Sequence, residues 1–130
     1  MTLGSLVGSK EGKVTPKPEL KVGMKYDQDK IPLELLSSIW IEGVGRVLQY
    51  GAKKYEAHNW RKGISTSRLL GASLRHIFAY LRGENQDPET GLSHLLHASC
   101  GLMFAYELSR TQPNLDDRYK VEISEGEETK

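Results

Sequence analysis

The side chains best suited to chemistry cluster between residues 76 and 97. Three carboxylates, those of Glu84, Asp87 and Glu89, stand within six residues of one another at the junction of two expected helices. Carboxylate oxygens are the ligands that hard divalent cations prefer, so the junction is a candidate metal site. The simpler interpretation is that Asp87 only caps the helix that follows, because aspartate is a common N-cap residue, while the two glutamates lie in water.

Histidines surround the same junction. His94 and His97 are three residues apart and therefore share a helical face, while His76 lies on the preceding helix, eight residues before Glu84. Small side chains continue the face of His94 and His97: Ala98, Gly101 and Ala105. This face leaves room for a ligand or for a closely approaching helix, and the histidines act either in chemistry or as hydrogen-bonded interface residues.

Two other groups of residues carry candidate chemistry. Glu42 either joins a metal site built from facing helices or forms a surface ion pair with Arg46, four residues further on. Residues 51–63 are basic and aromatic, with Lys54 suited to holding a phosphate and Trp60 suited to stacking on a base. The alternative is that Trp60 anchors this loop on the core and the lysines face solvent.

Three segments show the three- and four-residue spacing of apolar side chains that is typical of helices. The expected helices span residues 32–51, 65–83 and 87–110, beginning at Pro32, at Ser65 or Thr66, and at Asp87. The second is expected to bury the following apolar stripe: Leu70, Leu74, Ile77, Phe78 and Leu81. Since no segment alternates with a period of two, we predict an all-α fold in which the second and third helices are antiparallel.

The composition fits one soluble globular domain. The chain has 130 residues, and its 18 basic and 17 acidic side chains give a net charge of +1, which argues against a general binder of polyanions. No apolar run approaches the roughly 20 residues that a membrane span requires, and Met1–Leu6 has no signal-peptide pattern. The single cysteine, Cys100, excludes an internal disulfide and a cysteine-based zinc site. We expect a reducing, cytoplasmic setting.

The chain is expected to divide into three parts. Residues 1–24 are read as a flexible N-terminal arm, residues 25–111 as the helical domain that carries the chemistry, and residues 112–130 as an acidic C-terminal tail. A helical part of about 90 residues buries only a modest core, so oligomerisation is expected.

Six short blocks occur in order along residues 24–110: Lys25-Tyr26-Asp27 with Lys30, Gly51-Ala52-Lys53-Lys54-Tyr55, Asn59-Trp60, Arg75-His76, Gly83-Glu84 with Asp87, Glu89 and Gly91, and His94 with His97-Ala98. Together they resemble the phage MazG-like all-α nucleoside triphosphate pyrophosphohydrolases. Within these, they resemble most closely the dATP/dGTP diphosphohydrolases (MazZ-type) of phages that replace adenine with 2-aminoadenine in their DNA.

The resemblance implies a helical bundle assembled as a homo-oligomer, either a dimer or a tetramer, in the cytoplasm of the host cell. It implies hydrolysis of dGTP and dATP between the α and β phosphates, to the monophosphate and pyrophosphate. The reaction would use Mg²⁺, Mn²⁺ or Co²⁺. It would supply dGMP for the synthesis of 2-aminoadenine nucleotides and deplete dATP.

The resemblance also suggests roles for individual residues. The expected metal ligands are Glu42, Glu84, Asp87 and His94, and His76 or His97 would orient water or act as the base. The expected substrate contacts are Tyr26, Lys30, Lys54, Asn59, Trp60 and Arg75. The wider superfamily carries a Glu-Glu-x-x-Glu run and a Glu-x-x-Asp pair on its helices. In this chain, the positions of the Glu-Glu-x-x-Glu run are occupied by Gly71, Ala72 and Arg75. The positions of the Glu-x-x-Asp pair are occupied by His94 and His97.

Two other functions compete with this one. A metal phosphohydrolase of the HD type would need adjacent histidine and aspartate residues, and the sequence contains no such pair. A non-catalytic helical module could bind nucleic acid or a partner through Arg68, Arg75 and Arg82, but the near-zero net charge disfavours it.

Overall fold

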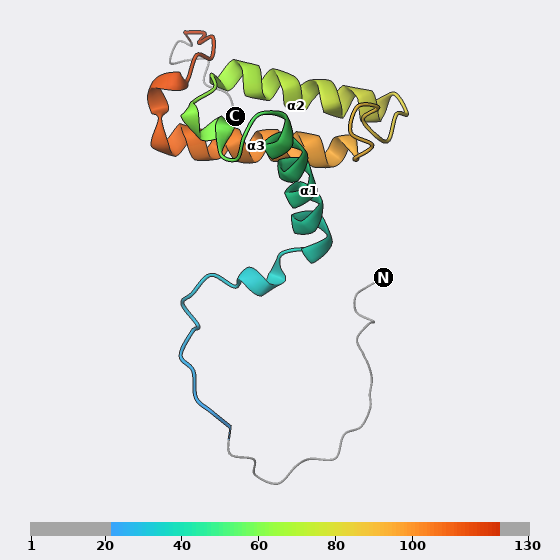
Figure 1. Ribbon diagram of the computed structural model, residues 1–130. Helices are drawn as coiled ribbons and strands as arrows, with labels where there is room; N and C mark the ends of the chain where they lie inside the picture. The colour runs from blue at the N-terminus through green and yellow to red at the C-terminus, as the bar shows by residue number, and fades with distance from the viewer. Residues whose placement is uncertain (1–21, 123–130) are drawn as a thin grey trace. The chain divides into compact units, whose positions relative to one another are not determined.

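A computed structural model of the chain describes residues 22–122 and divides the chain into two units, Met1–Leu33 and Glu34–Lys130 (Figure 1). The described part of the first unit is extended and exposed, with a turn in which the Lys30 N–H donates to the Asp27 carbonyl (3.0 Å). Of the expected N-terminal arm, residues 1–21 lie outside the described residues. The same is true of residues 123–130 of the expected tail.

The described residues form three α-helices and three short 3₁₀ helices. In chain order these are η1 (Leu33–Leu35), α1 (Ser38–Lys54), η2 (Asn59–Lys62), α2 (Thr66–Leu81), α3 (His94–Thr111) and η3 (Pro113–Leu115). Within residues 22–122 there is no strand, only an isolated antiparallel bridge between Gln86 and Ser93. The predicted all-α fold is therefore confirmed.

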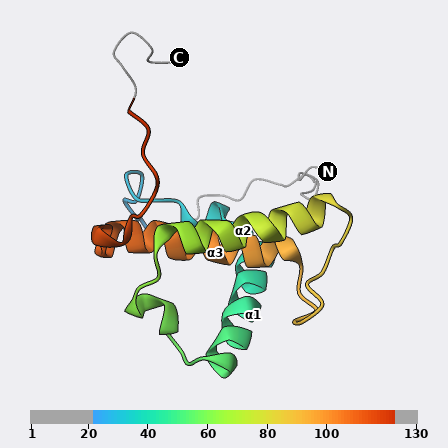
Figure 2. The ribbon, with the colours of Figure 1, turned by 90° about the horizontal axis from the view of Figure 1, so that it is seen from above.

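Helices α2 and α3 run antiparallel, side by side, as the sequence predicts (Figure 2). The two helices are in close contact at Ser73 on α2, which is almost fully buried and whose hydroxyl donates to the Ala98 carbonyl on α3 (3.0 Å). A Cβ atom at Gly101 would overlap the Ser73 hydroxyl. The small-residue face of α3 is thus used for packing within the chain.

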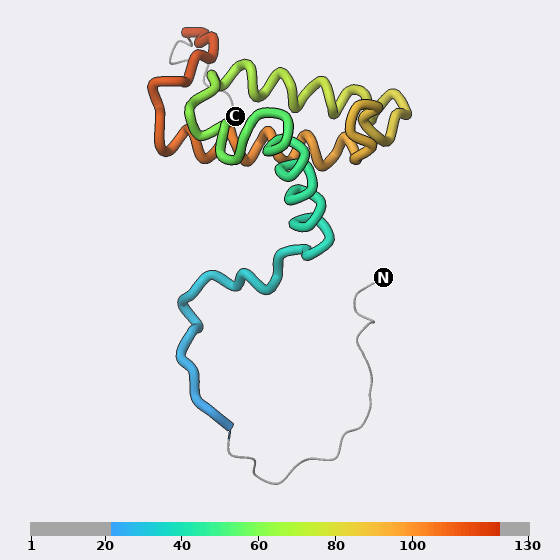
Figure 3. Tube along the Cα trace, viewed as in Figure 1, coloured from blue at the N-terminus to red at the C-terminus, as the bar shows by residue number. Residues whose placement is uncertain are grey.

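Helix α1 meets α3 at a steep angle and projects away from the helical pair (Figure 3). The Trp40 indole N–H donates to the Ser99 hydroxyl (2.9 Å), and Gly43 lies against Leu96, where a Cβ atom would overlap the leucine side chain. Glycine at this position therefore lets the backbone of α1 approach α3 closely.

The third helix begins later than the sequence suggests. The expected start at Asp87 is wrong: α3 begins at His94, after Ser93, whose hydroxyl accepts from the Leu95 N–H (3.0 Å). Gly91 has a φ of +74°, a conformation that interrupts any helix begun at Asp87. Asp87 instead organises the loop, where its Oδ1 accepts the N–H of Glu89 (2.7 Å).

The first helix is also displaced toward the C-terminus. It starts after Ser37, whose hydroxyl accepts from the Trp40 N–H (3.1 Å), and the chain at Pro32 only leads into the short helix η1. Gly51, the expected end, lies inside α1, which continues to Lys54. A serine cap at the start and an interior glycine tolerated by the helix explain the shift.

The apolar stripe expected to be buried on the second helix is largely exposed. Leu74 is 48% exposed, Phe78 51% and Leu81 73%, so their predicted burial is wrong for the single chain. Helix α2 packs mainly against α3, and its buried residues are instead Leu69, Ser73 and Ala79. Helix α1 turns away from the pair and leaves this apolar face uncovered.

Part of the expected tail packs on the helices. Asp117 accepts both the backbone N–H (2.8 Å) and the hydroxyl (2.6 Å) of Ser67, and the Leu115 carbonyl accepts from the Thr66 hydroxyl (3.2 Å). Ser65, the N-cap of α2, makes no side-chain capping bond. Asp117 therefore supplies a capping carboxylate from the far end of the chain, a favourable position for a negative charge.

The close contact between α2 and α3 yields a stability prediction. Gly101→Ala places a methyl group against the buried Ser73 hydroxyl, and we expect the free energy of unfolding to fall by about 1–3 kcal/mol. Gly45→Ala is the matched control, since open space surrounds Gly45 in α1 and alanine should stabilise the helix by about 1 kcal/mol. Urea unfolding followed by circular dichroism measures both. A Gly101→Ala protein as stable as the wild type would contradict the contact.

Candidate functional site

A pocket of about 800 Å³ lies between α1, η2 and the α2–α3 pair, large enough for a small-molecule ligand. One group of lining residues belongs to, or packs against, the hydrophobic core: Leu48, Trp60, Ile64, Leu69 and Phe104. A second group is polar and joined by mutual contacts: Tyr50, Lys54, His76, Asp87, Glu89, Thr90 and His97. The pocket therefore offers both apolar surface and a set of titratable side chains.

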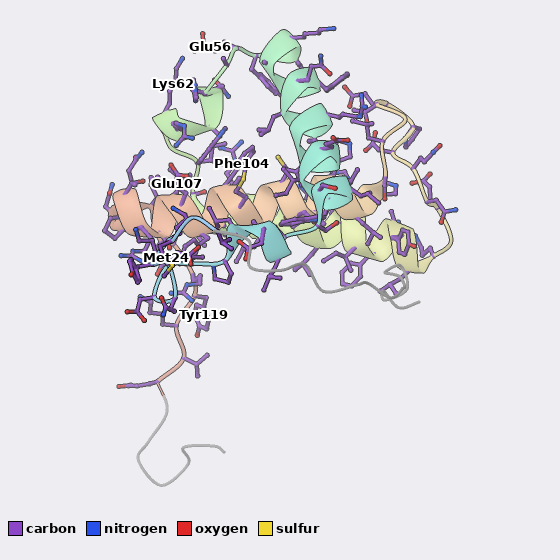
Figure 4. The ribbon with its side chains drawn as sticks, turned by 90° about the horizontal axis from the view of Figure 1, so that it is seen from below. Met24, Glu56, Lys62, Phe104, Glu107 and Tyr119 are labelled. Carbon is purple, nitrogen blue, oxygen red and sulfur yellow. The ribbon has the colours of Figure 1, made fainter. Side chains whose placement is uncertain are left out.

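The segment carrying η2 forms one wall of this pocket. Phe104 and Glu107 lie on the side of α3 that faces this segment, which also carries the ion pair of Glu56 and Lys62 (2.6 Å) (Figure 4). The Trp60 ring stacks on Phe104 with 4.4 Å between centroids and is only 7% exposed. Trp60 thus anchors the loop, and its ring offers little surface to a ligand.

The charged side chain of Arg61 also attaches this wall to α3. Its guanidinium lies over the Trp60 ring at 4.4 Å and forms an ion pair with Glu107 of α3. The Arg61 Nε–H donates to His58 Nδ1 (3.0 Å). The wall is therefore attached to α3 by an aromatic pair and an ion pair, and the Gln112 side-chain amide at the end of α3 also donates to the Arg61 carbonyl (3.0 Å).

Three side chains from α2, the following loop and α3 meet at the polar end. The Nδ1 atoms of His76 and His94 are 2.8 Å apart, and Asp87 Oδ2 is 3.9 Å from His76 Nδ1. One ligand atom of each residue lies within 4.8 Å of the others, an arrangement that can hold a metal ion. Two imidazoles and one carboxylate form a donor set common in transition-metal sites. We call His76, Asp87 and His94 the His–Asp cluster.

His97 adjoins the His–Asp cluster from one turn further along α3. Its ring stacks on that of His76, with 4.6 Å between centroids and 10° between planes. His97 Nε2 is 2.7 Å from the Thr90 hydroxyl, which also accepts the Leu92 N–H (3.1 Å). The loop therefore fixes the orientation of His97 beside the cluster.

The pKa values of these groups favour cation binding. Burial, with the neighbouring His97 and His94, lowers the pKa of His76, and burial also lowers the pKa of His97. Burial alone would raise the pKa of Asp87. The hydrogen bonds that its carboxylate accepts from the backbone N–H groups of Glu89 and Thr90 outweigh the effect of burial, so the pKa of Asp87 is lowered. At neutral pH His76 and His97 are therefore largely uncharged, while Asp87 is anionic.

A turn at the end of α2 places Glu84 against the cluster. Gly83 has a φ of +105°, its N–H donates to the Tyr80 carbonyl (2.9 Å), and the Glu84 N–H donates to the Ala79 carbonyl (3.0 Å). This is the Schellman motif, which favours glycine at the first position after the cap. Glu84 Oε1 then lies 2.7 Å from His94 Nε2.

Glu89 connects this loop to the last turns of α1. Its Oε2 accepts from the Tyr50 hydroxyl (2.8 Å) and from the Lys54 ammonium (3.1 Å). The hydrogen bond from Tyr50 has the largest effect in lowering the pKa of Glu89, and the hydrogen bond from Lys54 has the next largest. Sequence reasoning did not select Tyr50, although its position four residues before Lys54 places both on one helical face.

The structure brings together only some of the expected site residues. The pocket is lined by His76, His97, Asp87, Lys54, Asn59 and Trp60. His94 contacts both His76 and Glu84. Glu42 and Arg75 are exposed on α1 and α2 and belong neither to the pocket lining nor to the His–Asp cluster. Tyr26 and Lys30 lie in the other unit, and their roles stay predictions.

Fold and site together define an all-helical protein with a histidine–carboxylate cluster beside a small-molecule pocket. The chain belongs to the dATP/dGTP diphosphohydrolase family, because residues 21–118 match the family model described as dATP/dGTP diphosphohydrolase, N-terminal. The family assignment based on the sequence blocks is thereby confirmed. No helix in residues 22–122 has the length and apolar character to span a membrane.

A relative from Salmonella phage PMBT28, named dATP/dGTP diphosphohydrolase, is 44% identical to this chain over 96 residues. The match covers 74% of this chain and 33% of the relative, so the chain spans about a third of the length of the curated relative that it matches. No solved structure matches the chain significantly.

Proposed function

We propose that the chain carries the site at which a purine deoxynucleoside triphosphate, dGTP or dATP, is hydrolysed to the monophosphate and pyrophosphate. The observation that carries this proposal is the His–Asp cluster beside a pocket of about 800 Å³ in a chain of this family. The substrate class follows the name of the phage relative. In a phage-infected cell, such an enzyme would act on the cytoplasmic nucleotide pool, releasing dGMP and depleting dATP.

The charges of the pocket support a dependence on a divalent metal ion. The lining contains two basic side chains, Lys54 and Arg61, and each is already paired with a carboxylate. It also contains four carboxylates: Glu56, Asp87, Glu89 and Glu107. A triphosphate would be repelled by this lining unless cations accompany it. When bound, a divalent ion would polarise the phosphate oxygens and lower the pKa of the attacking water.

The chemistry of the donor set favours Mn²⁺ or Co²⁺ over Mg²⁺. His76, His94 and Asp87 offer two nitrogen atoms and one carboxylate, whereas Mg²⁺ prefers oxygen ligands alone. Glu84 contacts His94 rather than joining this set. We therefore assign His76, Asp87 and His94 as the residues that would hold the ion.

His97 adjoins the His–Asp cluster and is suited to acting as the general base. It lines the pocket, its lowered pKa leaves it uncharged at neutral pH, and Thr90 fixes its orientation. Lys54, also in the lining, would exchange its contact with Glu89 for a phosphate oxygen. The apolar lining beside Asn59 would take the base, with the Asn59 amide available for its polar edge.

Incubation of the purified protein with dGTP and Mn²⁺, followed by chromatography of the products, tests the proposed reaction. We expect dGMP and pyrophosphate. EDTA should abolish turnover, and added Mn²⁺ should restore it more effectively than Mg²⁺. Release of dGDP with phosphate, or of deoxyguanosine with tripolyphosphate, would contradict the site of cleavage. Turnover after exhaustive chelation would contradict the dependence on metal.

Asp87→Asn separates the two roles of this side chain. The asparagine oxygen can still accept the N–H groups of Glu89 and Thr90, so the melting temperature should change little. The lost negative charge should lower kcat roughly 100-fold or more. Glu42→Gln, assayed in parallel, tests the other expected carboxylate ligand: if only this variant loses turnover, the ion binds on α1 instead.

The exposed apolar face of α2 supports the proposed homo-oligomer. Leu74, Phe78 and Leu81 are 48–73% exposed in the single chain, more apolar surface than one helix normally leaves to water. Light scattering at micromolar concentration should give two or four times 14.6 kDa. Because Leu74 and Phe78 are about half exposed and lie outside the buried core, Leu74→Glu with Phe78→Glu should yield a folded monomer. A wild-type mass of one chain would refute the oligomer.

A further inference from the structure

We infer that Glu84 is a positioning residue, which holds the ring of His94 so that His94 Nδ1 presents its lone pair to a divalent cation. This inference rests on the metal site of the proposed function. It gives Glu84 a role distinct from that of a metal ligand, because its carboxylate contacts the opposite nitrogen of the ring.

The contact itself defines the tautomer of His94. The distance from Glu84 Oε1 to His94 Nε2 is 2.7 Å, and an ionised carboxylate can only accept a hydrogen bond. The hydrogen of the neutral ring is therefore on Nε2, and Nδ1 carries the lone pair. The His94 side chain is only 5% exposed, whereas that of Glu84 is 53% exposed.

The other nitrogen of His94 faces the His–Asp cluster. His94 Nδ1 lies 2.8 Å from His76 Nδ1, a distance that requires one hydrogen between the two atoms. Since Glu84 fixes the hydrogen of His94 on Nε2, the hydrogen between the rings belongs to His76. With His94 Nδ1 and His76 Nδ1 both holding a cation, the neutral His76 ring would carry its hydrogen on Nε2 instead, with no net change in protonation.

Backbone geometry holds both partners of the contact. The Schellman motif at Gly83 fixes the path of Glu84 at the end of α2, and the His94 N–H donates to the Asn85 carbonyl (3.0 Å) at the start of α3. Backbone hydrogen bonds of the loop between α2 and α3 thus fix the positions of both Glu84 and His94. Hydrogen bonds of this kind, from an imidazole ligand to a carboxylate, orient the ligand and typically strengthen metal binding 10–100-fold.

Two measurements test the inference on the full-length chain. The first is the tautomer of His94, read from ¹⁵N–¹H correlations of the imidazole rings without metal. The wild type should show the Nε2–H form, and Glu84→Ala should lose it. The second is the Kd for Mn²⁺ alone. Glu84→Gln keeps an accepting oxygen but loses the charge, and should weaken binding roughly 10-fold. Glu84→Ala should weaken it up to about 100-fold.

A matched control and separate readouts keep the outcomes distinct. Glu34→Gln removes an exposed carboxylate from η1 and should leave the Kd for Mn²⁺ unchanged. Wild-type affinity for Mn²⁺ in both Glu84 variants would overturn the inference. Weakened Mn²⁺ binding in Glu84→Ala with the His94 tautomer unchanged would also overturn it, because this result would make Glu84 a direct ligand. A wild-type protein that shows the Nε2–H form but binds no Mn²⁺ would instead overturn the metal site of the proposed function.

Discussion

The close approach of α2 and α3 at Ser73 and Gly101 is the constraint on which the site depends. His76 lies three residues after Ser73, and His97 lies four residues before Gly101, so the helices are still close where these rings stack. A larger residue at the contact would separate the helices, and the imidazoles would no longer lie within hydrogen-bonding distance. The geometry of the site therefore depends on the small residues at this contact.

Local patterns were sufficient to predict part of this arrangement. Helical periodicity identified α2 and α3, and a short connection made them antiparallel, which is enough to bring His76 toward His94 and Asp87. The start of α3 was not predictable in the same way, because Asp87 and Ser93 are both good capping residues. The positive φ at Gly91, a property of the folded loop, decides between them.

The predicted burial of the α2 stripe was wrong because that burial depends on the angle of α1, which no periodic pattern encodes. Apolar spacing shows that a helix has a face to bury but does not show which neighbour covers it. Because α1 turns away from the pair, Glu42 is directed to solvent and the face of Leu74 and Phe78 is left uncovered. Of the two roles expected for Trp60, stacking on a base or anchoring its loop, the stack on Phe104 of α3 shows the anchor.

The wall of the pocket and the His–Asp cluster are built on different parts of the chain. The wall is attached to α3 by the Trp60–Phe104 stack and the Arg61–Glu107 pair, whereas the cluster is held between α2, the loop and α3. Substitutions in the wall can therefore reshape the space for a ligand while the cluster keeps its geometry. Such a division lets a lineage change the molecule that it recognises without rebuilding its reactive centre.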